Sequence, residues 1–61
     1  MVVQDLCELY IESGEEMEIY SLSKSETVFK GEFSEAEYCE FAYEEIASFG
    51  IESGKIVINI D

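Results

Sequence analysis

Fifteen acidic side chains and only three lysines, with no arginine or histidine, give these 61 residues a formal net charge of −12. Self-repulsion at this density destabilises the compact state, so such a charge balance usually needs a reason beyond solubility. A phosphate backbone or an anionic membrane would repel such a surface. Direct binding to DNA, to RNA or to a membrane is therefore not expected.

The apolar residues indicate that the chain folds despite its charge. They make up 48% of the chain, including four Phe and four Tyr, which is too many for an acidic disordered tail. A chain of this length forms a single domain, 1–61, without linker or repeat, and buries only roughly 60% of its unfolded surface. Its stability is therefore marginal, and binding to a partner or to a second copy, as a homodimer, is an expected source of more.

Cys7 and Cys39 are the only cysteines. No apolar signal segment precedes them, and no run approaches the roughly 18 apolar residues that span a bilayer, so we expect a cytoplasmic protein with reduced thiols. The alternative is a disulfide between them. Free cysteines in such a setting behave as small buried hydrophobes.

The first half of the chain changes from a helical to an alternating pattern. Residues 2–11 place acidic and apolar side chains on opposite sides at helical spacing, which predicts a helix that ends at Ser13-Gly14. Alternation then predicts a strand over 17–22. A polar turn at 23–25 and β-branched or aromatic residues over 27–32 complete a predicted hairpin.

A capping signal predicts the start of a second helix. Ser34 stands three residues before Glu37, the spacing of a capping box, and Phe33 could pack against Tyr38 as a hydrophobic staple. We therefore expect this helix to begin at Glu35.

Two interpretations remain for the residues that follow. Helical spacing continues as far as Gly50 through apolar residues, namely Cys39, Ala42, Tyr43, Ile46 and Phe49. The competing interpretation makes 45–51 a strand, because Ser53-Gly54 would serve as a short hairpin loop before the β-branched strand 55–60.

The pattern of the whole chain resembles a group of small proteins. VVQDLCELYI, then EIYSLSKSETVFKGEF, then a short acidic helix and IASFGIESGKIVINI are similar to small acidic proteins from Firmicutes genomes and their phages. The resemblance implies an α+β domain of the order αββαββ (helix, hairpin, short helix, hairpin) with an antiparallel sheet. It also favours a strand at 45–51 and a phage or mobile-element context.

Little chemistry is available to these side chains. Without histidine, Ser-His-Asp and Cys-His arrangements cannot be built, and paired-carboxylate catalysis needs a cleft that so small a domain can scarcely provide. The run Glu12-Ser13-Gly14-Glu15-Glu16 lacks the ligand spacing of a calcium loop, and no phosphate-cradling glycine motif is present. We expect no enzymatic activity, no metal site and no cofactor.

The carboxylates themselves form the candidate binding site. They are expected in the first loop and on or just beyond the second helix, and the seven are Glu12, Glu15, Glu16, Glu35, Glu37, Glu40 and Glu44. A carboxylate row with a few Å per residue roughly matches strand phosphates, which lie about 3.4 Å apart. We therefore expect a non-enzymatic, anti-CRISPR-like inhibitor that mimics nucleic acid and binds a basic host protein. In the alternative, the acidity serves solubility only and the domain is a small interaction module that assembles with itself.

Overall fold

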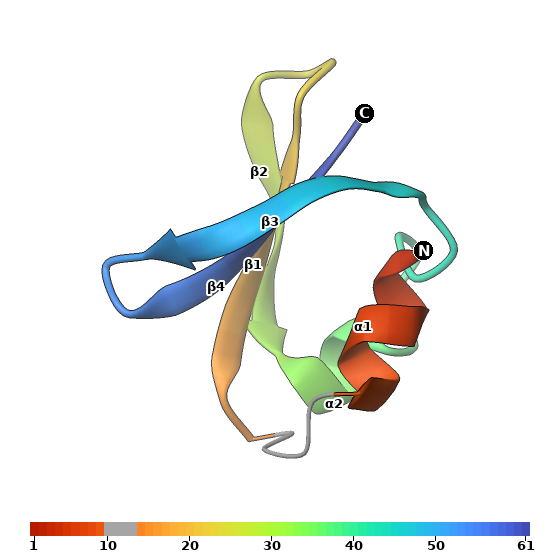
Figure 1. Cartoon of the computed structure of the whole chain (residues 1–61), viewed down its shortest axis with the longest axis vertical. Helices are drawn as coiled ribbons and strands as arrows, with labels where there is room; N and C mark the ends of the chain where they lie inside the picture. Colours follow the sequence, from red (N-terminus) through yellow and green to blue (C-terminus); the bar gives the residue numbers. More distant parts are fainter. Residues whose placement is uncertain (10–13) are drawn as a thin grey trace.

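Two β-hairpins form a single twisted sheet, and two short helices pack beside it (Figure 1). The computed structural model describes residues 1–9 and 14–61. In chain order the elements are α1 (Val3–Leu9), β1 (Glu16–Ser21), β2 (Glu26–Glu32), α2 (Phe33–Ala36), β3 (Ile46–Glu52) and β4 (Lys55–Ile60). The α+β class predicted from the sequence is confirmed. The predicted end of the first helix, at Ser13-Gly14, falls partly outside the described residues.

The sheet has the strand order β2-β1-β4-β3. Each hairpin is antiparallel, but the two central strands, β1 and β4, run parallel, with Ile19 beside Ile58. The prediction of an antiparallel sheet was therefore wrong for the central pair. The cause lies in the connection: from β2 the chain crosses through α2 and residues 37–45 to the far edge, forms β3 there, and then returns as β4 next to β1.

The segment with two interpretations is a strand. β3 runs from Ile46 to Glu52, which confirms the strand prediction for 45–51 and excludes a helix that continues to Gly50. The turn decides the outcome, because Ser53 and Gly54 have φ angles of 52° and 79°. Two positive φ angles in a two-residue loop match the right-handed twist of the flanking strands.

The second helix begins two residues earlier than predicted. Glu32 is its N-cap, and Oε1 of Glu35 accepts a hydrogen bond from the Glu32 backbone N–H at 3.0 Å. The capping box predicted at Ser34 and Glu37 was therefore wrong. Two capping signals overlap in the sequence, and burial of Phe33, 1% exposed, inside the helix rather than before it selects the earlier one.

The core lies between the helices and one face of the sheet. Alternate residues of the central strands point into it, and its buried apolar members are Val3, Cys7, Met17, Ile19, Phe33, Ala36, Ala42, Ile58 and Ile60. The opposite face carries half-buried residues such as Glu18, Tyr20 and Val57. The tip of the β3–β4 hairpin extends away from both helices, so the helices cover only part of the inner face (Figure 1).

Gly31 and Gly50 have opposite surroundings, which gives a first prediction. A Cβ on Gly31 would lie 2.8 Å from Oε1 of Glu35 and 3.0 Å from the Phe29 ring, whereas a Cβ on Gly50 meets nothing within 4 Å. Gly31→Ala should lower the free energy of unfolding by about 1–2 kcal/mol, because the α2 cap or the ring has to move. Gly50→Ala should raise it by about 0.5–1 kcal/mol.

Urea unfolding followed by circular dichroism, at low protein concentration, measures both glycine variants. Equal effects of the two substitutions would contradict the packing described around Gly31.

Candidate functional site

The predicted carboxylates come from different elements rather than from one helix. Only Glu35 lies on α2, while Glu37, Glu40 and Glu44 lie on the irregular segment 37–45. Glu15 and Glu16 stand at the start of β1. Glu12 lies outside the described residues. Glu35 thus lies on the second helix and Glu37, Glu40 and Glu44 lie just beyond it, but their spacing is not that of a regular row, because α2 ends at Ala36 and the chain then turns to place Ala42 in the core.

The segment 37–45, called the acidic segment below, is fixed to the first turn of α1. The backbone N–H groups of Val3 and Gln4 donate to the carbonyl oxygens of Glu44 and Ala42 at 3.0 and 2.8 Å. The Gln4 side chain donates to the Glu37 carbonyl at 3.1 Å. The first N–H groups of a helix have no partner within it, so these bonds satisfy α1 and give the acidic segment a defined position.

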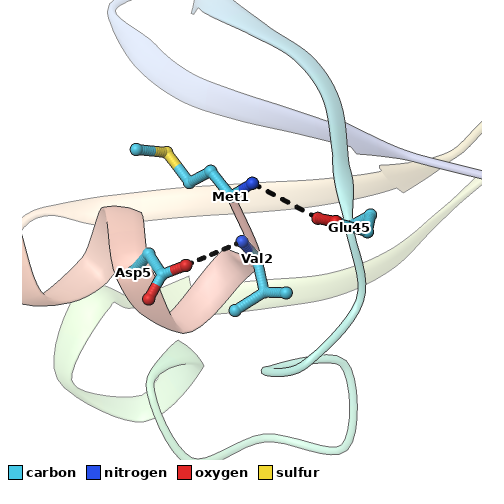
Figure 2. A network of polar contacts seen from close by, with 4 residues as sticks. All are labelled: Met1, Val2, Asp5 and Glu45. Atoms are coloured by element: carbon cyan, nitrogen blue, oxygen red, sulfur yellow. Dashed lines mark hydrogen bonds and ion pairs between the residues drawn. The ribbon is translucent and has the colours of Figure 1, made fainter.

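Two further contacts hold the same junction, and Figure 2 shows them side by side. The Val2 N–H donates to Oδ2 of Asp5 at 3.0 Å, as at a helix N-cap, and the Met1 amino group lies 3.3 Å from Oε2 of Glu45. The acidic segment therefore presents its side chains from a fixed backbone.

Two of the predicted carboxylates line a hollow of about 310 Å³, called the acidic hollow below. Glu40 and Glu44 come from the acidic segment, Asp61 follows β4, and Lys24 comes from the β1–β2 turn. The other lining residues are mostly apolar, namely Val28, Phe41, Ile60 and the buried Ser21. The hollow therefore combines three carboxylates and one lysine with three apolar side chains.

Asp61 and Lys24 were absent from the sequence-based site. Their distance from the acidic segment in the chain gives no local signal, and only the β1–β4 pairing brings the end of β4 beside the turn that follows β1. Ser21 marks this junction, because its Oγ accepts from the Lys24 backbone N–H at 3.2 Å and lies 3.4 Å from the Asp61 carbonyl.

Most of the negative charge has no positive partner. Lys55 pairs with Glu16 at 3.5 Å and Glu18 at 3.9 Å, and the Met1 amino group pairs with Glu45. Within residues 1–9 and 14–61, no other carboxylate has a cationic group within 4.0 Å. Apart from the half-buried Glu18 and Glu37, the carboxylates of these residues are exposed. Their mutual repulsion is therefore neutralised only at Glu16 and Glu45.

Cys7 and Cys39 are both free thiols, as the sequence predicted, and Cys7 is buried. Burial, together with the smaller effect of the charges of Cys39, Glu37 and Glu8, raises the pKa of the Cys7 thiol to about 11. Only the thiolate is a nucleophile, so Cys7 behaves as a core side chain.

The pKa of Cys7 gives a second prediction. Near pH 8, roughly one Cys7 in a thousand is ionised, so a chromogenic disulfide reagent should label Cys7 far more slowly than the half-buried Cys39. Because the folded pKa exceeds the ordinary value of 9.0, Cys7 also contributes stability that is complete below pH 9 and is lost as the pH rises toward 11. Labelling of Cys39→Ser and Cys7→Ser variants separates the two rates, and equal rates in the folded protein would contradict the burial of Cys7.

The arrangement suits the binding of cationic groups at a surface. In the part of the chain that the structure describes, no group of three or more Cys, Asp or Glu side chains is placed to hold a metal ion. Over the same residues, neither helix has the length and apolar character needed to cross a membrane. Comparisons of the chain with models of known protein families, with curated proteins and with solved structures found no match.

Proposed function

We propose that this chain is a non-enzymatic inhibitor whose acidic surface binds a basic, nucleic-acid-handling host protein. The observation that carries the proposal is the exposure of unpaired carboxylates on a fixed backbone, above all Glu40 and Glu44. Free carboxylates at this density attract a Lys- and Arg-lined surface and accelerate its association. The resemblance to small phage proteins makes an anti-defence role, such as that of an anti-CRISPR protein, the specific form of the proposal.

The acidic hollow gives the contact a focus. A lysine or arginine of the host protein would lay its aliphatic stem against Val28 and Phe41 and place its charged head among Glu40, Glu44 and Asp61. Arginine would bind better than lysine, because its planar guanidinium can pair with carboxylates in a bidentate manner and stack on an aromatic ring. Lys24 lies at the same hollow but forms no ion pair within 4.0 Å in the described residues.

The mimicry that we propose concerns charge density rather than a regular spacing of charges. The carboxylates at Glu37, Glu40 and Glu44 lie on turns, so they do not follow the constant rise of a helix. A basic channel that binds phosphates mainly through electrostatic attraction tolerates such irregularity, since its affinity depends on how many charges are neutralised.

Competition with nucleic acid tests the proposal. The immobilised chain is exposed to nuclease-treated bacterial lysate, and bound proteins are eluted either with duplex DNA or with salt. We expect basic nucleic-acid-binding proteins, released by both, and we expect the free chain to inhibit their binding to DNA or guide RNA. Capture that resists both eluents, or that leaves nucleic-acid binding intact, would contradict the proposal.

A further inference from the structure

β3 is an edge strand without charge along most of its length. Residues 46–51 form the longest stretch of the chain that lacks Asp, Glu and Lys. Phe49 and Ile51 point to the same face as the core but lie beyond the helices, and they are 58% and 76% exposed. An exposed apolar edge strand is a template for pairing with another strand.

The other edge of the sheet is protected against such pairing. β2 carries Glu26, Lys30 and Glu32, and its register with β1 shifts between Ile19 and Tyr20. Charged side chains and bulges are the devices that keep edge strands apart. β3 has a register shift only at its start, between Ile46 and Ser48, and is regular from Ser48 to Glu52. The two edges therefore differ in the feature that controls association.

Gly50 provides a second, independent observation. It lies in the middle of β3 without a left-handed φ angle, and a Cβ there would meet no atom within 4 Å. Glycine weakens a strand interior, and it often marks a bulge, a tight bend or a site where a ligand or another backbone approaches closely. Nothing in the described chain approaches Gly50 in this way.

We propose that β3 pairs antiparallel with β3 of a second copy of the chain, across a two-fold axis near Gly50. In this register Phe49 of each copy stands opposite Ile51 of the other, and Glu52 stands opposite Ser48. The pairing joins the sheets edge to edge, places apolar side chains together on one face and sets no carboxylate opposite another.

The distribution of charge favours a second copy of the chain, rather than a basic protein, as the partner of β3. A basic partner is attracted to the carboxylates, and residues 46–51 carry none. Two chains that each carry −12 repel everywhere else, so the uncharged edge is where they can meet at the lowest electrostatic cost. This inference does not depend on the proposed function, because it uses a different surface.

Salt dependence distinguishes this dimer from a complex with a basic protein. Between about 0.01 and 1 M NaCl the Debye length falls from ~30 to ~3 Å, so added salt screens the repulsion between copies. Sedimentation equilibrium should show a monomer–dimer equilibrium whose dissociation constant falls on the order of tenfold or more over this range. Hydrogen exchange at β3 amides should slow as the dimer forms.

Ile51→Lys and Thr27→Lys make a matched pair of variants. Both positions are exposed on edge strands, and both substitutions add one positive charge, which by itself reduces the repulsion between copies. We expect Ile51→Lys to weaken dimerisation by about tenfold or more, because the symmetric contact loses two cross-strand pairs. Thr27→Lys should leave it unchanged or slightly stronger. Circular dichroism checks that both variants fold.

Four results would overturn the inference. If the chain stays monomeric at about 1 mM protein and about 1 M salt, β3 does not pair with a second copy. A strand of another protein is then the partner of β3. A dimer that dissociates as salt is added is held together by ion pairs and not by the uncharged edge of β3. A dimer that survives Ile51→Lys, or whose β3 amides exchange as fast as those of the monomer, uses another surface. None of these results bears on capture of a basic protein by the acidic segment.

Discussion

Ile58→Ala should remove most of the stability of the folded chain. Ile58 is fully buried on central strand β4, beside Ile19 of β1 and opposite Phe49 of β3. Truncation of a buried isoleucine costs about 2–5 kcal/mol, and a domain of this size has only about 3–9 kcal/mol in total. We therefore expect the far-ultraviolet circular dichroism spectrum of Ile58→Ala to show a largely unfolded population at 25 °C.

Val57→Ala is the matched control, because Val57 is the neighbouring residue on the open face of the same strand and is half-buried. It should lower the free energy of unfolding by about 1 kcal/mol or less in urea titrations. Phe29→Ala should fall between the two, since Phe29 is a large side chain that is only half-buried on β2. Similar losses for Ile58→Ala and Val57→Ala would mean that the core does not lie on the face described here.

Local signals account for the elements that the sequence predicted well. The β-branched run 55–60 and the Ser53-Gly54 turn give β4 and its hairpin, because turn type and strand propensity act over a few residues. Local signals did not predict the start of the second helix correctly, because two possible capping boxes overlap in the sequence. Which of the two capping boxes forms depends on the burial of Phe33, and that burial is a property of the tertiary structure.

The false helical stripe has the same explanation. Tyr43 was part of the predicted stripe and Tyr38 was predicted to pack against Phe33 as a staple, yet these tyrosines are 75% and 80% exposed. The chain instead forms turns over 37–45, which the hydrogen bonds from Val3 and Gln4 of α1 hold in place. These partners are about 40 positions away in the sequence, so no periodicity within the segment could reveal them.

The candidate site was predictable in composition but not in geometry. Glu40 and Glu44 were predicted from charge density alone, and both line the acidic hollow. Lys24 and Asp61 join them only because β1 and β4 lie parallel at the centre of the sheet, a pairing between distant parts of the chain. Glu35 turned out to cap α2, so its carboxylate also serves the fold.

Reversal of two charges at the acidic hollow should abolish binding to a basic partner. The proposed site includes Glu35, Glu37, Glu40 and Glu44, but Glu35 caps α2 and Glu37 is half-buried, so the clean variant is Glu40→Lys with Glu44→Lys. Like charges across an interface cost several kcal/mol, which corresponds to about a hundredfold or more in affinity. Much of this loss should appear in the association rate, because the carboxylates steer the encounter.

The control for this variant is Glu8→Lys with Glu26→Lys, which reverses two exposed carboxylates away from the hollow. Each double variant changes the net charge from −12 to −8, since each substitution adds two charges. Biolayer interferometry with an arginine-rich peptide and with a captured host protein measures binding, and circular dichroism measures folding. Both variants should fold as well as the parent, because each relieves repulsion. Equal losses of affinity in the two folded variants would mean that net charge alone drives binding. If the hollow variant binds the partner as tightly as the parent does, the carboxylates of the acidic hollow are not the binding site. The acidity then serves solubility only.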